Sequence, residues 1–109
     1  MGSFKFTTAP QQIDATVEGT FTPSDAQAFL AEYNKAITKV TPAQATLSIT
    51  TTGLAVSSKD MQEILKGCIE LYKSTGFKKV VMITGDNVIV KMQLQRLAKE
   101  IGFSEIVIQ

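Results

Sequence analysis

The stretch from Ala45 to Tyr72 places a strand pattern directly before a helix pattern, with a serine pair between them. Apolar and polar side chains alternate from Ala45 to Thr50, which predicts a β-strand with one covered face. Apolar side chains then recur at three- and four-residue spacing, which predicts a helix that buries one stripe: Met61, Ile64, Leu65, Cys68 and Tyr72. The chain is therefore predicted to be an α/β fold organised around this strand and helix.

The residues before this stretch predict an N-terminal hairpin and a first helix. Two alternating runs, around residues 4–6 and 13–21, are predicted to pair with each other. Thr22 and Asp25 flank a proline that suits a first helical position. The first helix is therefore predicted from about Pro23 to about Thr38, ending before Thr41-Pro42.

The residues after it predict two more strands and a third helix. The apolar run Val80–Ile83 is typical of a strand inside a sheet with both faces covered. Asp86 is the predicted cap of a helix through Ile101, and Glu105–Ile108 is the predicted last strand. The predicted order is β-β-α-β-α-β-α-β.

Short connections between alternating strands and helices imply parallel pairing with right-handed crossovers, the hairpin being the antiparallel exception. A chain of 109 residues is long enough for one core and too short for two. We expect residues 1–109 to form a single domain, a mixed sheet of four or five strands with three main helices.

Composition excludes several classes of function. With 11 bases against 10 acids, the chain has no clustered basic charge for nucleic acid. It contains no histidine, which removes His-based catalytic triads and most zinc sites, so no metal or cofactor is expected. Cys68 lies within the apolar stripe and is predicted to be core. No apolar run would span a membrane or resemble a secretory signal, which predicts a cytoplasmic protein.

This order of elements, with the loop Val56-Ser57-Ser58 before an amphipathic helix that ends in glycine, resembles the STAS domain of bacterial anti-sigma factor antagonists. The similarity runs from about Ala15 to Ile108 and rests on element order and spacing. The family's loop typically reads Asp-Ser-Ser-Gly, and its first serine is phosphorylated by a kinase that is also an anti-sigma factor. The resemblance implies Ser57 as phospho-acceptor, with Ser58 beside it. Val56 stands where the family has Asp, and Lys59 where it has Gly.

Two interpretations of the serine pair remain open. Ser57 and Asp60 fit a capping box, in which the serine hydroxyl only satisfies a first-turn amide. Alternatively the serine is a regulated site, because phosphate at a helix start binds the same amides while adding about −2 charge. The surface predicted to bind a partner is Gly53, Leu54, Val56, Ser57, Ser58, Lys59 and Met61.

Two other polar groups have ordinary structural explanations. Gly85-Asp86 follows a strand at the edge where open α/β sheets bind ligands, but without a phosphate-binding motif a turn and a helix cap explain both residues. The hydroxyl-rich set is predicted to be a solvated strand face: Thr46, Ser48, Thr50, Thr51 and Thr52.

The sequence therefore favours a non-enzymatic protein-interaction module that docks through residues 53–61 and is switched by serine phosphorylation. Its expected partner is a protein, of the kinase or anti-sigma type that the resemblance implies. The alternative is a structural or assembly subunit that self-associates through a sheet edge or the threonine face. The chain is accordingly expected to be a monomer or a weak homo-oligomer. An enzyme would need carboxylates such as Asp86 or Glu63 in a pocket.

Overall fold

The computed structural model describes residues 2–55, 58–103 and 106–109. The predicted order of elements is confirmed, with a short 3₁₀ helix, η1, added before the third strand. The elements are β1 Ser3–Ala9, β2 Gln12–Gly19, α1 Pro23–Ile37, η1 Pro42–Gln44, β3 Thr46–Leu54, α2 Lys59–Thr75, β4 Lys79–Ile83, α3 Val88–Glu100 and β5 Ile106–Ile108.

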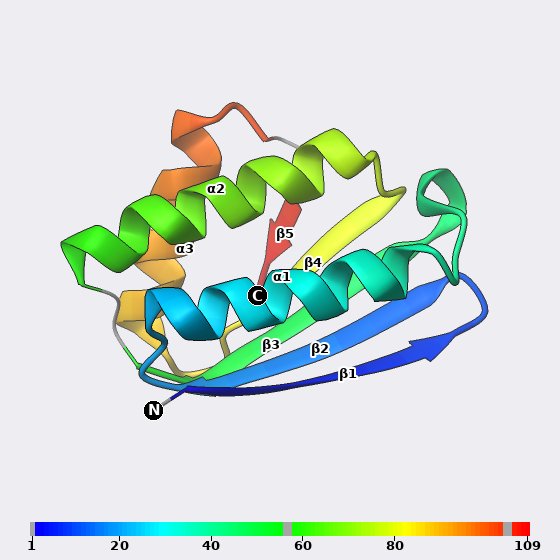
Figure 1. The fold of residues 1–109 in the computed structure, drawn as a ribbon. Coiled ribbons are helices and arrows are strands. Elements are labelled where there is room, and N and C mark those ends of the chain that lie inside the picture. Colours follow the sequence, from blue (N-terminus) through cyan, green and yellow to red (C-terminus); the bar gives the residue numbers. More distant parts are fainter. Residues whose placement is uncertain (1, 56–57, 104–105) are drawn as a thin grey trace.

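The five strands form one mixed sheet in the order β1-β2-β3-β4-β5. β1 and β2 pair antiparallel, as the predicted hairpin, and the other three pairs are parallel. Because β2 to β5 are added in sequence order, crossovers of one hand bring every helix to the same face. Figure 1 shows α1, α2 and α3 together on one side of the sheet. The molecule therefore has two layers.

The core lies between these two layers. Leu47 and Ile49 of β3 and Val80 and Met82 of β4 are buried against the helices. Val81 pairs with Ser48 in register and faces the other side of the sheet, where no described helix lies, yet it is only 9% exposed. The predicted burial of both faces of this strand therefore holds for Val80, Val81 and Met82, although the described helices cover only one face of the sheet.

Thr51 was predicted to belong to the solvated threonine face, and this prediction is wrong. It continues the alternation of Leu47 and Ile49 and is only 1% exposed. Its hydroxyl donates to the Ile83 carbonyl oxygen at 3.1 Å, so the buried oxygen has a partner. Thr46, Ser48 and Thr50 are half-buried on the opposite face, and Thr52 is exposed.

Three predicted helix caps can be compared with the helix ends in the structure. Thr22 and Asp25 form the predicted capping box, with Thr22 Oγ1 accepting from the Asp25 amide at 3.2 Å and Asp25 Oδ2 accepting from the Thr22 amide at 2.9 Å. Gly76 follows α2 with φ +82°, as a left-handed cap requires. The prediction of Asp86 as the cap of α3 is wrong: the helix begins at Val88, so Asn87 holds the cap position, without a side-chain cap bond.

Candidate functional site

The predicted partner-binding residues that the structure describes gather at the carboxyl end of the parallel strands. Gly53 and Leu54 end β3, while Ser58 and Lys59 begin α2, with Met61 in its first turn. Gly53, Ser58 and Lys59 are exposed, whereas Leu54 and Met61 are half-buried. The predictions for Val56 and Ser57 lie outside the described residues.

Ser58 is the cap of α2. Its Oγ accepts a hydrogen bond from the Met61 amide at 3.3 Å, and its backbone is extended. The cap of α2 therefore lies one residue later than the predicted capping box of Ser57 with Asp60. With Ser58 as cap, the third helical position is Met61, whose side chain has no oxygen to accept a hydrogen bond from the Ser58 amide, so no capping box forms. An exposed hydroxyl thus lies at the partly positive end of a helix of 17 residues.

Asn87 ties the start of α3 to the end of β3. Its side-chain amide donates to the carbonyl oxygens of Thr51 at 3.1 Å and Leu54 at 2.8 Å. This explains why Asn87 makes no cap bond: its side chain holds the neighbouring strand instead. Arg96, in the middle of α3, donates to Gln62 in the first turn of α2, so the start of α2 lies beside the middle of α3.

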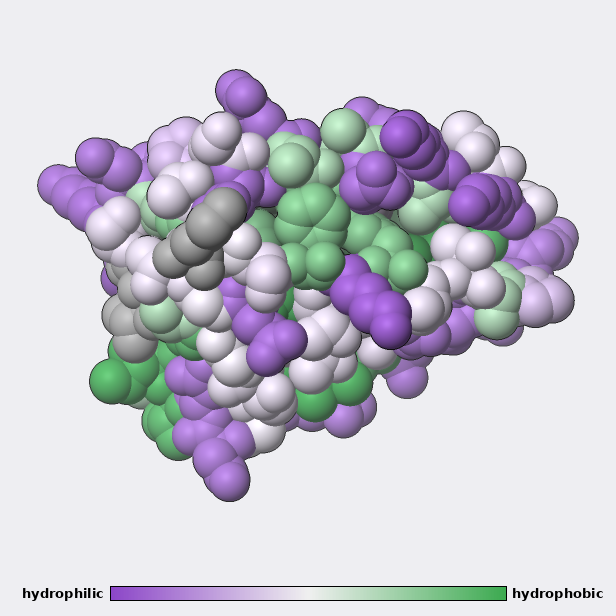
Figure 2. Space-filling view, turned by 60° about the horizontal axis from the view of Figure 1, so that its bottom comes forward, coloured by the Kyte–Doolittle hydropathy of each residue, from purple (hydrophilic) through white to green (hydrophobic). Residues whose placement is uncertain are grey.

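The first turns of α3 expose an apolar patch that the sequence analysis missed. Val88 and Ile89 are each 59% exposed, and Met92 is 63% exposed. We call these three residues the α3 patch. The signal was present in the sequence, because the buried stripe of Val90, Leu94 and Leu97 leaves these apolar side chains on another side of the helix. In Figure 2, hydrophobic side chains project at the lower left of a largely hydrophilic view.

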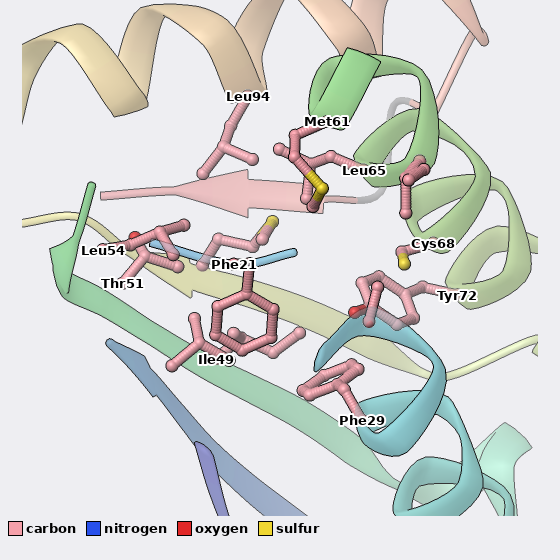
Figure 3. A pocket seen from close by; sticks show the side chains of 14 residues that line it. Phe21, Phe29, Ile49, Thr51, Leu54, Met61, Leu65, Cys68, Tyr72 and Leu94 are labelled. Carbon is pink, nitrogen blue, oxygen red and sulfur yellow. The ribbon is translucent and has the colours of Figure 1, made fainter. Parts of the chain in front are cut away.

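Beneath this surface, between the sheet and the helices, lies an apolar cavity of about 60 Å³. Figure 3 shows side chains of the strands and of all three helices around it. The largest contribution comes from one face of α2: Met61, Ile64, Leu65, Cys68 and Tyr72. Phe21, Leu54, Met61 and Leu65 are half-buried, so the cavity is bounded by partly exposed side chains at the carboxyl end of the sheet.

The polar groups of the lining are all neutral. Burial raises the pKa of the Cys68 thiol to about 11, so this thiol is not a nucleophile at neutral pH. Burial, with smaller effects of Cys68 and Tyr33, raises the pKa of Tyr72 well above its ordinary value. Among the residues that the structure describes, no lysine, arginine or carboxylate lines the cavity. The prediction that Cys68 is core is confirmed, since it is 7% exposed.

The carboxylates that an enzyme would need do not converge. Glu63 and Asp86 are both exposed and neither lines the cavity. Among the described residues there is no group of three or more Cys, Asp or Glu side chains arranged to hold a metal ion. In the same part of the chain, no helix combines the length and apolar character needed to cross a membrane.

No protein-family model and no curated protein matches this sequence. Among solved structures, the chain is similar to an uncharacterised protein of the DUF3478 family from Shewanella loihica PV-4, described as having a SpoIIAA-like fold. The TM-score is 0.66 at 16% identity, and the match covers 99% of this chain and 85% of that one. This chain therefore has the SpoIIAA-like fold, which is the STAS fold that the sequence resembled.

Proposed function

We propose that this chain is a non-enzymatic protein-interaction module whose partner docks at the carboxyl end of the sheet. The SpoIIAA-like fold is typically such a module. The docking surface comprises Gly53, Ser58, Lys59 and the α3 patch. The observation that carries the proposal is the α3 patch, because exposed apolar side chains grouped on a helix mark interaction sites.

The chemistry of this surface favours a protein partner. Methionine and large aliphatic side chains become favourable contacts once water is removed, and methionine is enriched at interfaces. The hydroxyl of Ser58 lies at the same end of the sheet and is neutral. A partner with a matching apolar surface and no acidic group opposite Ser58 fits this arrangement.

The finer proposal is that phosphorylation of Ser57 or Ser58 prevents docking. The partner would then be a kinase that is also an anti-sigma factor, as the sequence resemblance implies. A phosphate at Ser58 would accept hydrogen bonds from first-turn amides of α2 while placing about −2 charge on the docking surface. Removing that charge from water against an apolar partner is unfavourable, so the modified chain would be released.

The test uses an ATP-dependent serine kinase of the anti-sigma type that the sequence resemblance implies, sought among the genes next to the one that encodes this chain. Mass spectrometry after incubation with ATP should locate phosphate on Ser57 or Ser58, and Ser57→Ala combined with Ser58→Ala should abolish it. Ile89→Glu should weaken binding of the kinase to the unphosphorylated chain about tenfold or more, which corresponds to roughly 1.4 kcal/mol. Ala31→Glu, an equivalent change at an exposed position of α1, is the matched control and should bind normally.

Two outcomes separate this proposal from self-assembly. If the kinase neither binds nor labels the chain, and light scattering shows an oligomer that Ile89→Glu returns to a monomer, the α3 patch is a contact between copies and the assembly alternative holds. A monomer that binds the kinase through the α3 patch supports the interaction module, and absence of label alone removes only the switch.

A further inference from the structure

We propose that the cavity between the sheet and α2 is a binding site for a small neutral apolar molecule that carries one hydrogen-bond acceptor, and that the Tyr72 hydroxyl donates to that acceptor. This site is independent of the proposed protein partner. It rests on the cavity, on its uncharged lining and on the unusual position of Tyr72.

Tyr72 is a buried polar residue whose hydroxyl lacks a protein partner. The residue is 2% exposed, yet within the described part of the chain no group forms a hydrogen bond with its hydroxyl. No fully enclosed side-chain nitrogen or oxygen of the described residues lacks a partner, so this oxygen keeps some exposure, and Tyr72 is one of the residues that line the cavity. Figure 3 shows the Tyr72 oxygen directed into the space that the lining side chains surround.

A second buried tyrosine shows that this arrangement is not inherent in the fold. Tyr33 is 0% exposed, and its hydroxyl lies 2.7 Å from Thr75 Oγ1. Thr75 Oγ1 gives its own proton to the Leu71 carbonyl oxygen at 2.7 Å, so Tyr33 must be the donor. Buried tyrosine hydroxyls normally find such a partner. Tyr72 therefore keeps a donor available in a place where one is costly to leave unpaired.

The lining specifies the chemistry of the ligand. Tyr72 is neutral at physiological pH, since its pKa is raised, and it therefore presents a proton. The Thr51 hydroxyl already donates to Ile83. The described lining contains no cationic side chain, so a carboxylate or phosphate would be buried there without a counter-charge, which is strongly unfavourable. An apolar body with a carbonyl, ether or alcohol oxygen fits.

The volume of the cavity limits the size of the ligand. A cavity needs about 10–15 Å³ of such volume to hold one water, so about 60 Å³ accommodates about four to six non-hydrogen atoms. Water is a poor occupant, because a buried water usually makes about three hydrogen bonds and here Tyr72 supplies one. The partly exposed Phe21, Met61 and Leu65 place the entrance at the carboxyl end of the sheet.

The test titrates the full chain with three probes and follows backbone amide shifts by NMR: 2-pentanone, butanoate and xenon. We expect saturable shifts around Leu65, Cys68 and Leu94 with 2-pentanone and with xenon, and none with butanoate. Tyr72→Phe should weaken 2-pentanone binding about three- to tenfold, the effect of one neutral hydrogen bond, and leave xenon binding unchanged. Tyr33→Phe is the matched control and should bind both probes normally.

Ala26→Leu provides a second variant, because Ala26 lines the cavity and the larger side chain would occupy it. It should abolish binding of both probes while the chain stays folded. The proposal is overturned if the wild-type chain binds neither probe, or if 2-pentanone binds equally well to wild type and Tyr72→Phe. Binding of butanoate with an affinity like that of 2-pentanone would also overturn it.

Discussion

The two ends of the interlayer core contain the same kinds of side chain, but these side chains are packed and hydrogen-bonded differently. At the amino end of the parallel strands, Tyr33 packs against Phe77 with ring centroids 6.3 Å apart, and its hydroxyl is paired with Thr75. At the carboxyl end, Phe21, Met61 and Leu65 surround an open volume. Tyr72 lines that volume from the boundary between the two ends: its ring centroid lies 5.3 Å from that of Tyr33, and its hydroxyl has no described partner. We call these the closed end and the open end.

The difference shows which part of the core serves stability alone. A closed end with full packing and paired polar groups is what folding by itself favours. Leaving a void and an unpaired donor at the open end costs stability, and the partner surface proposed above borders the same end. Such a cost is typical of sites kept for binding.

The largest expected difference is between matched leucine truncations. Leu47→Ala at the closed end should cost about 3 to 5 kcal/mol, because Leu47 is 0% exposed and its removal leaves a new cavity. Leu65→Ala at the open end should cost about 1 to 2 kcal/mol, since Leu65 is half-buried beside an existing void. Urea denaturation measures both. Equal losses would mean that the two ends are packed alike.

The next effect is on stability at high pH. Burial raises the pKa of the Cys68 thiol from its ordinary value of 9.0 to about 11, and the pKa of Tyr33 from 10.0 to about 12. The unfolded chain therefore releases these protons first, and stability is complete below about pH 9 and falls as pH rises from 9 toward 12. Denaturation curves at pH 8, 10 and 11 should show this fall.

Cys68→Ala separates the contribution of the open end. This variant should flatten the part of the curve between pH 9 and pH 10, where the cysteine titrates in the unfolded chain, and leave the later fall due to the tyrosines. An unchanged slope between pH 9 and 10 would show that the thiol is not buried as described.

A smaller difference is expected between the tyrosine hydroxyls. Tyr33→Phe should cost about 0.5–1.5 kcal/mol, the net value of one hydrogen bond. Tyr72→Phe should be neutral or slightly stabilising, because it removes an unpaired polar atom from a buried position. The free energy of unfolding of each variant in the absence of ligand gives the answer. A loss at Tyr72 as large as that at Tyr33 would reveal a partner for the Tyr72 hydroxyl.

The smallest effect concerns the two helix starts that border the open end. Thr22→Ala should cost about 1 kcal/mol, because it removes one of the two reciprocal bonds of a capping box. Ser58→Ala should cost less, about 0.5 kcal/mol, since the exposed Ser58 makes a single bond of 3.3 Å. Thermal denaturation of the two variants shows which of them loses more stability. A larger loss at Ser58 would assign this serine a structural role beyond capping.

The order of elements and much of the site could be predicted because they follow from local patterns. Alternation gives strands, spacing of three and four gives helices, and Thr22-Pro23 gives a helix start. The place of residues 53–61 at the end of a strand and the start of a helix followed from the same patterns. Ser58 rather than Ser57 caps α2 because the helix starts one residue later than expected, which a pair of identical residues cannot reveal.

The sequence by itself determined the secondary structure, the resemblance in element order, the absence of histidine chemistry and the buried character of Cys68, because each depends on composition or on neighbours within a few residues. Only the tertiary structure decided that the described helices lie on one face of the sheet, that Thr51 turns inward and that Asn87 holds β3. It alone separated Tyr33 from Tyr72. Packing and hydrogen-bond pairing join side chains that are distant in the chain, and no local pattern records whether such partners meet.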